Sequence, residues 1–384
     1  MKTLVFTWLL IVLAGIPLPV EAQPGHAKDV LIGYFGPNDM AHPEGGDMWC
    51  AATLAIEQAN LAGGFHGRPF KLITGWSENP WGSGVKALTH MVYQDQVWAI
   101  IGGIDGPSTH LAEQVVAKAR LPLLSGANAD RTANLANVPW MFSILPGHHL
   151  QAAALTKTIE SQVKRKRFVM VSSVDHDAHI LTDELNRCLR KRQLSPHYHF
   201  EFKPGHLHDS EPVNHIIKAN AEAVVIAASL QDTAHLTVRL RQKGFNGILF
   251  GGACMSRQAF VDIAGEAAEG VIFPLLYRPS ETTRQFNKDM LDHSGRSAND
   301  LSAHTYDTVK LLLEAIQQAG LNRQHIRDTV SKLSPWQGVT GTIHWDQQGS
   351  NTRPVTTGTL LNGCVTPYPI TVSERPSSTR PQSR

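Results

Sequence analysis

The chain has few cysteines, little net charge and, beyond its N-terminus, no long apolar run. Its 384 residues contain four cysteines, which are too few for a disulfide framework, and the sequence does not say whether any of them pair: Cys50, Cys188, Cys254 and Cys364. A net charge of +2 with both signs interspersed gives no electrostatic basis for binding nucleic acid. No later apolar stretch approaches the roughly 18 residues of a membrane-spanning helix.

Sequence motifs of the common enzyme classes are also missing. The chain has no G-x-S-x-G, no G-x-x-x-x-G-K-[ST], no H-E-x-x-H and no G-x-G-x-x-G after its first expected strand. Ser108 and Cys254 are possible nucleophiles without an identifiable partner base, and Asp105, His176 and Asp177 could converge across a cleft. A hydrolytic role therefore stays open as an alternative, but we predict that the protein is not an enzyme and uses no cofactor.

The first 22 residues have the pattern of a cleavable export signal. Lys2 provides a positive charge, residues 4–16 are apolar, and Val20-Glu21-Ala22 fits a small-x-small cleavage site. A lipid anchor would need a cysteine directly after the signal, and the first cysteine is Cys50. We expect a soluble, periplasmic chain whose last residues, 371–384, are disordered because they are poor in apolar side chains.

Strand and helix patterns alternate along the rest of the chain. The expected strands are short apolar runs at 30–35, 69–73, 97–101, 121–124, 168–172, 224–228, 248–251 and 271–276. The first expected helix begins at 45–47. Further helices are expected at 85–92, 109–119, 149–163, 180–192, 233–242 and 303–319, and Ser108 is the expected N-cap of the helix at 109–119. Continuously apolar strands between helices predict parallel sheets covered on both faces. The rhythm restarts after Pro146, which predicts an α/β protein with two Rossmann-like lobes.

Several segments resemble the type I periplasmic solute-binding proteins of ABC importers, in the branched-chain amino acid and amide family that includes the leucine/isoleucine/valine-binding protein. The resemblance covers about residues 28–370, and the order and spacing of its segments carry it. These segments are D-V-L-I-G-Y-F-G-P (29–37), A-I-E-Q-A-N-L-A-G-G-F-H-G-R-P (55–69), W-A-I-I-G-G (98–103), L-P-L-L-S-G-A-N (121–128), G-E-A-A-E-G-V (265–271), H-T-Y-D (304–307) and W-Q-G-V-T-G-T-I-H-W-D-Q-Q-G (336–349). The last segment also predicts a β-hairpin with a tight turn at Gly349.

The resemblance implies two lobes joined by three hinge strands, with ligand between them. The N-terminal lobe would comprise residues 28–145 and 277–334, and the C-terminal lobe residues 146–276 and 335–370. We expect a monomer that closes around a small polar molecule and delivers it to an ABC permease complex in the inner membrane. A periplasmic sensor that reports its ligand to a membrane receptor is the alternative.

The resemblance also points to ligand-binding residues in the loops that follow the strands. These candidates are Asp105, Gly106, Ser108, Ala127, Asn128, Asp177, Leu230 and Cys254. In the family, such loops hold the carboxylate and ammonium of an amino acid. Here the expected serine position reads Gly106 or Ser108, and the glutamate that grips an ammonium is replaced by Cys254. Acidic residues would instead suit a ligand with amine, amide or hydroxyl donors.

Two further features each have an alternative interpretation. Trp81 is either another wall of the pocket or a loop tryptophan that covers the end of a sheet. The D-H-D-A-H run at 175–179 contains ligand types that zinc prefers, with His176 and His179 on one helix face, but loop histidines are more often solvated or helix-capping. We predict no metal site.

Overall fold

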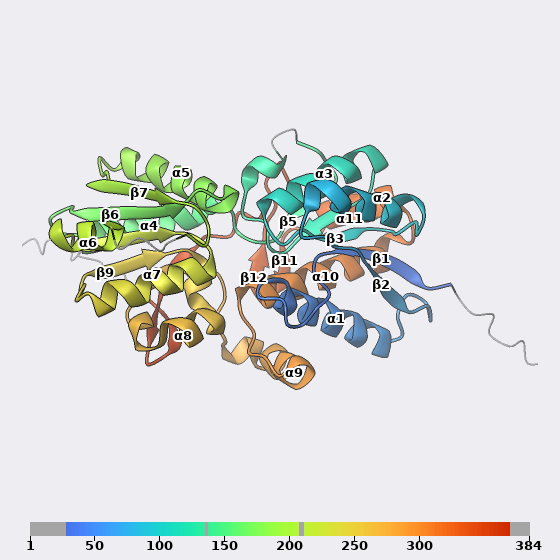
Figure 1. The fold of residues 1–384 in the computed structure, drawn as a ribbon. Helices are drawn as coiled ribbons and strands as arrows, with labels where there is room; N and C mark the ends of the chain where they lie inside the picture. Colours follow the sequence, from blue (N-terminus) through green and yellow to red (C-terminus); the bar gives the residue numbers. More distant parts are fainter. Residues whose placement is uncertain (1–27, 135–136, 207–210, 369–384) are drawn as a thin grey trace, which may run out of the picture.

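The computed structural model describes residues 28–134, 137–206 and 211–368. Figure 1 shows two lobes side by side, each built on its own sheet with helices against both faces. The expected α/β architecture with two lobes is therefore confirmed. The predicted export signal and the tail from residue 371 lie outside the described residues. Within the described ranges, no helix is both long and apolar enough to cross a membrane.

The first lobe contains a parallel five-stranded sheet in the order β2-β1-β3-β4-β5. Its strands are β1 (Val30–Phe35), β2 (Phe70–Thr74), β3 (Ile100–Gly102), β4 (Leu123–Ser125) and β5 (Met141–Ser143). Its helices are α1 (Gly45–Leu61), η1 (Pro80–Gly84), α2 (Val85–Tyr93), α3 (Gly106–Ala119), η2 (Arg131–Asn134), η5 (Glu281–Thr283), α9 (Arg284–Ser294), α10 (Asp300–Ala319) and α11 (Arg323–Lys332). Alternate residues of β1 enter the two cores, because successive side chains of a strand point to opposite faces.

The second lobe contains a seven-stranded sheet in the order β14-β13-β10-β9-β8-β6-β7. Its strands are β6 (Phe168–Ser173), β7 (Tyr198–Phe202), β8 (Ala223–Ala227), β9 (Ile248–Gly251), β10 (Ile272–Leu275), β13 (Thr356–Leu361) and β14 (Cys364–Pro367). Its helices are α4 (His148–Gln162), α5 (His176–Lys191), α6 (Glu211–Lys218), α7 (Leu230–Gln242), η3 (Ala253–Ser256), α8 (Gln258–Ala264) and η4 (Gly265–Ala268). The strands from β7 to β10 are parallel, whereas β13 and β14 add an antiparallel edge that the sequence pattern did not predict.

The chain passes between the lobes three times, after β5, after β10 and before β13, and the crossings are tied to one another. The Asn351 backbone N–H donates to the Ser143 carbonyl at 2.9 Å, and its side-chain amide donates to the Ile144 carbonyl at 2.8 Å. Arg353 donates to the Leu276 carbonyl at 2.9 Å. These bonds join all three crossings into one connection between the lobes, which we call the hinge.

The helix that follows β3 begins three residues earlier than expected. Asp105, not Ser108, is the N-cap, since its carboxylate accepts the Ser108 N–H at 2.7 Å. Pro107 fits the first turn because an N–H there would have no partner within the helix. In the same way, α5 begins at His176 behind the cap Asp175, and α7 begins at Leu230 behind the cap Ser229. Three of the loops predicted to reach the cleft are thus partly helical.

The closing segment forms a hairpin from β11 (Trp336–Gly338) and β12 (Gly341–Ile343), but it reverses at Val339 and Thr340 and not at the expected D-Q-Q-G, which forms a separate turn beside the Trp345–Asn351 bridge. Gly349 ends the following turn with φ 73°, a conformation that side chains with a Cβ rarely adopt. The proposed chain division places residues 335–370 in the second lobe. In the structure, Trp336, Ile343 and Trp345 instead pack into the first lobe's core beside α10, and only β13 and β14 join the second sheet.

Candidate functional site

A cavity of about 380 Å³ lies between the two lobes. The first lobe contributes residues just before α1, after β3 and β4, and at the start of α10, among them Glu44, Ile104, Asp105, Ala127, Asp300 and Leu301. The second lobe contributes residues at the starts of its helices, among them His148, Gln151, Asp175, Asp177, Leu230, Cys254 and Arg257. Ligands of parallel α/β sheets bind at the carboxyl ends of the strands, which is where this cavity lies.

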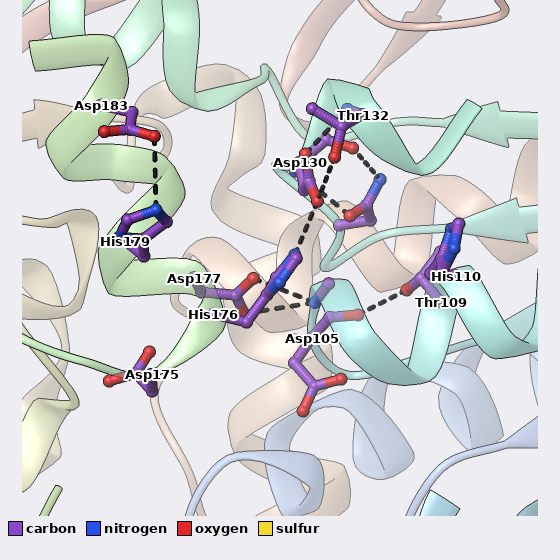
Figure 2. Close-up of polar contacts among 12 residues, drawn as sticks. Asp105, Thr109, His110, Asp130, Thr132, Asp175, His176, Asp177, His179 and Asp183 are labelled. Atoms are coloured by element: carbon purple, nitrogen blue, oxygen red, sulfur yellow. Dashed lines mark hydrogen bonds and ion pairs between the residues drawn. The ribbon is translucent and has the colours of Figure 1, made fainter. Parts of the chain in front are cut away.

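The start of α5 reaches across to the first lobe at two adjacent residues. Both carboxylate oxygens of Asp177 accept the backbone N–H of Gly106, at 3.1 and 3.2 Å. The next contact is between His176 Nε2 and a carboxylate oxygen of Asp130, at 2.8 Å. Figure 2 shows both contacts, where α5 meets the segments after β3 and β4. A Cβ on Gly106 would overlap the Asp177 carboxylate, so this approach requires glycine.

Two ion pairs add to these contacts between the lobes. Arg257 lies just before α8 and binds Asp300 at the start of α10 through two bonds, Nε–Oδ1 at 2.8 Å and Nη2–Oδ2 at 2.9 Å. Such a bidentate pair fixes both distance and orientation. Arg131 in η2 pairs with Glu184 in α5 at 3.2 Å. Four polar contacts therefore join the two lobes beside the cavity.

Burial shifts the protonation of several groups that line the cavity. It raises the pKa of Asp177 to about 7, against the opposing hydrogen bond from Gly106. It lowers the pKa of His148 to about 4, so this imidazole is neutral at physiological pH. It raises the pKa of the Cys254 thiol to about 11, so the thiolate needed for nucleophilic chemistry is scarce. Cys254 is therefore a neutral wall of the cavity.

Comparison with known proteins assigns the family. The family model described as "Periplasmic binding protein" matches residues 36–363, which is most of the chain. The chain belongs to this family. An amino acid binding protein of Pseudomonas aeruginosa is 22% identical over 330 residues, covering 84% of this chain and 87% of that protein.

Solved structures of periplasmic binding proteins show the same fold. The leucine binding protein LivK from Thermotoga maritima is 20% identical with a TM-score of 0.79, and the alignment covers 88% of this chain and 98% of that one. LivJ from Streptococcus pneumoniae, solved in complex with isoleucine, is 19% identical with a TM-score of 0.81, and covers 88% of this chain and 97% of that one. At such identities the likeness establishes the fold, which is the one expected from the sequence resemblance.

The structure brings together five of the nine residues that we predicted for the ligand site of this binding protein. The residues that line the cavity are Asp105, Ala127, Asp177, Leu230 and Cys254. Gly106 lies beside them and donates to Asp177. Ser108 and Asn128 are buried behind the wall, where Ser108 completes the capping box of α3 and Asn128 donates to Ser143. Trp81 is 57% exposed and is not among the lining residues.

Sequence reasoning missed the strongest polar pair of the site and two of its acceptors. Arg257 and Asp300 carry no motif, and they meet only because the loop after β9 faces the start of α10. Glu44 and His148 each precede or begin a helix that points at the cavity. The one signal in the sequence for these residues is their position near a helix start that follows a strand, and the family resemblance points to other loops.

The D-H-D-A-H run does not converge on one point. His176 pairs with Asp130, whereas His179 faces Asp183 on its own helix at 3.4 Å, and Figure 2 shows the two imidazoles directed apart. Asp175 caps α5 by accepting the Ala178 N–H. Across the described parts of the chain, no group of three or more His, Cys, Asp or Glu residues is arranged to hold a metal ion.

Proposed function

We propose that this protein is an exported, monomeric solute-binding protein that encloses a small polar ligand between its lobes and delivers it to an ABC importer. The observation that carries the proposal is a cavity of about 380 Å³ lined from both lobes, beside contacts that join the lobes. A cavity of this size suits a molecule of amino-acid or amide dimensions. The relatives support the proposal, since one is an amino acid binding protein and another was solved with isoleucine.

The hinge supports closure around the ligand as the mechanism. All three crossings are joined by backbone and side-chain bonds at Ser143, Leu276 and Asn351, so opening changes few contacts outside the cleft. A ligand that contacts both walls stabilises the closed form by the difference in its affinity for the two forms. The closed form presents both lobes to a permease in one fixed relation.

The first test is a ligand screen on the mature protein. A thermal-shift panel of amino acids, amides, ureas, polyamines and sugars should contain a ligand that raises the unfolding midpoint by several degrees, because ligand at 100 times its dissociation constant adds about 2.7 kcal/mol. Substituting Leu230→Trp should fill the cavity and abolish that shift, since Leu230 lines it and is buried. Leu361→Trp is the matched control in the same lobe, at an exposed position.

The second test separates transport from sensing. Ligand-loaded protein should stimulate the ATPase of an importer encoded beside its gene, and Leu230→Trp should not. Ligand binding without any such stimulation would contradict delivery to an importer and would favour a sensor that acts with a membrane receptor. A complete absence of ligand shifts would contradict solute capture itself.

A further inference from the structure

The N-terminus of α3 is occupied by a carboxylate of the protein itself. Gly106 is the first residue of that helix, and its N–H points at Asp177 of the other lobe. The first N–H groups of a helix have no partners within the helix, and the helix dipole adds a partial positive charge there, so this end attracts anions. In the same first turn, the Ser108 N–H is satisfied by Asp105. The carboxyl group of Asp177 therefore already occupies the free N–H at this end of α3.

The rest of the cavity wall offers little to a second anion. Among the described residues, Arg257 is the one lysine or arginine that lines the cavity, and Asp300 takes the Nε–Nη2 edge of its guanidinium. Three more acidic side chains, Glu44, Asp105 and Asp175, line the same space without a lysine or arginine partner. A ligand carboxylate would thus meet like charges from these side chains, and at the α3 N-terminus it would have to displace Asp177.

The same wall is rich in acceptors for a ligand that donates hydrogen bonds. Asp105 and Asp175 both line the cavity, and the caps of α3 and α5 engage only Oδ1 of each carboxylate. His148 lines the cavity too, and its Nδ1 is buried without a hydrogen-bond partner among the described residues. A buried ring nitrogen without a partner is costly, and a ligand that forms a hydrogen bond with it would relieve that cost.

We propose that Asp177 determines ligand specificity by occupying the α3 N-terminus, so that the cleft takes a ligand with ammonium, amidinium or amide donors and without a carboxylate. This inference rests on the proposed function and narrows it to a class of ligand. It also separates this chain from a binder of free amino acids, although its fold is the same.

The test uses pairs of ligands that differ in the carboxylate alone. Arginine and agmatine, lysine and cadaverine, and leucine and leucinamide are titrated into the mature wild-type protein by calorimetry. For at least one pair, we expect the member without a carboxylate to bind at least tenfold more tightly. A wild-type protein that binds the amino acid of a pair as tightly as its partner overturns the inference, while leaving solute capture intact.

Asp177→Ala tests the named residue, with Asp183→Ala as its matched control. Both variants lose one carboxylate from α5, but Asp183 is 56% exposed and lies outside the cleft. In Asp177→Ala the preference should shift at least tenfold toward the amino acid of each pair, because the α3 N-terminus becomes free. The control should keep the wild-type preference. Equal effects of the two substitutions would assign the preference to general charge and overturn the role of Asp177.

A measurement without ligand keeps the inference separate from the proposed function. The Gly106 amide resonance in a ¹H–¹⁵N spectrum should move, and its hydrogen exchange should accelerate, in Asp177→Ala but not in Asp183→Ala. An unchanged Gly106 amide overturns the inference even if no ligand has been found. If instead the amide responds and no compound of any class binds, solute capture fails and the Asp177 contact stands.

Discussion

The bidentate pair of Arg257 and Asp300 should control the balance between open and closed lobes. Asp300 is almost fully buried and Arg257 is 15% exposed, so Asp300→Asn leaves a guanidinium in the wall without its counter-charge. Leaving one charge of a buried pair uncompensated costs about 3–5 kcal/mol in a structure that cannot relax. Here the partners belong to different lobes, and opening at the hinge returns Arg257 to water. The cost should therefore appear as opening instead of global unfolding.

The expected magnitude follows from that difference. A loss of about 3 kcal/mol from the closed form changes the ratio of closed to open molecules by about 150-fold, at 1.4 kcal/mol for each factor of ten. Ligand-free Asp300→Asn should therefore show a larger radius of gyration in small-angle X-ray scattering than the wild type. Its free energy of unfolding in urea should fall by less than the full 3–5 kcal/mol.

Asp47→Asn provides the control. Arg296 pairs with Asp47 at 2.8 Å within the first lobe, so breaking that pair should lower stability without changing the scattering curve. The reasoning is refuted if Asp300→Asn keeps the wild-type radius of gyration, whether the unfolding energy falls by the full amount or not at all. The double variant with Arg257→Met should recover part of the loss, because no unpaired guanidinium remains.

Three further predictions concern pH, the hairpin of β11 and β12, and metal. Burial raises the pKa of Asp177 from 3.8 to about 7, so the stability that its protonated form contributes is present below about pH 4 and is lost as pH rises through 7. Relative to the wild type, Asp177→Asn should therefore raise the free energy of unfolding in urea by up to about 4 kcal/mol at pH 8, at 1.36 kcal/mol per pKa unit, and by less than half of that at pH 5. An equal effect at both pH values would contradict this. Asp307 accepts the Val339 and Thr340 N–H groups at 2.8 and 2.9 Å. In Asp307→Asn one of these N–H groups would face the amide N–H₂, so the free energy of unfolding in urea should fall by about 2–3 kcal/mol. An unchanged urea midpoint would contradict this. EDTA should leave the thermal midpoint unchanged, whereas a drop would revive a metal site at 175–179.

The sequence predicted the repeating architecture because short-range patterns encode it. Apolar strands such as β1 and β9 were placed at their observed bounds, since a buried parallel strand is a short apolar run between turn residues. Helix starts were less well predicted: α3, α5 and α7 each begin three or four residues before the expected position. The three observed caps, Asp105, Asp175 and Ser229, are residue types that favour the N-cap position. The first turns after them are rich in polar residues, so the apolar stripe that identifies a helix in sequence begins only several residues later.

The partners in the cleft could not be predicted from the sequence. The sequence indicated Asp105 and Asp177 as cleft residues through the strand ends that they follow, but not that Asp177 would bind Gly106, 71 positions away. Arg257 and Asp300 are separated by 43 positions and lie on different lobes. Such contacts depend on how the hinge sets one lobe against the other.

The sequence by itself determined the alternation of strands and helices, the two-lobed architecture and the family, because hydrophobic periodicity and turn residues act over a few positions. Only the tertiary structure decided which charges meet across the cleft, and therefore which chemistry the cavity offers. Asp175 and Asp177 both lie at the start of α5, and nothing in the sequence distinguishes their roles. Asp175 caps its own helix, whereas Asp177 binds the first N–H of α3. The choice depends on the position of the opposite lobe, which rests on long-range packing at the hinge.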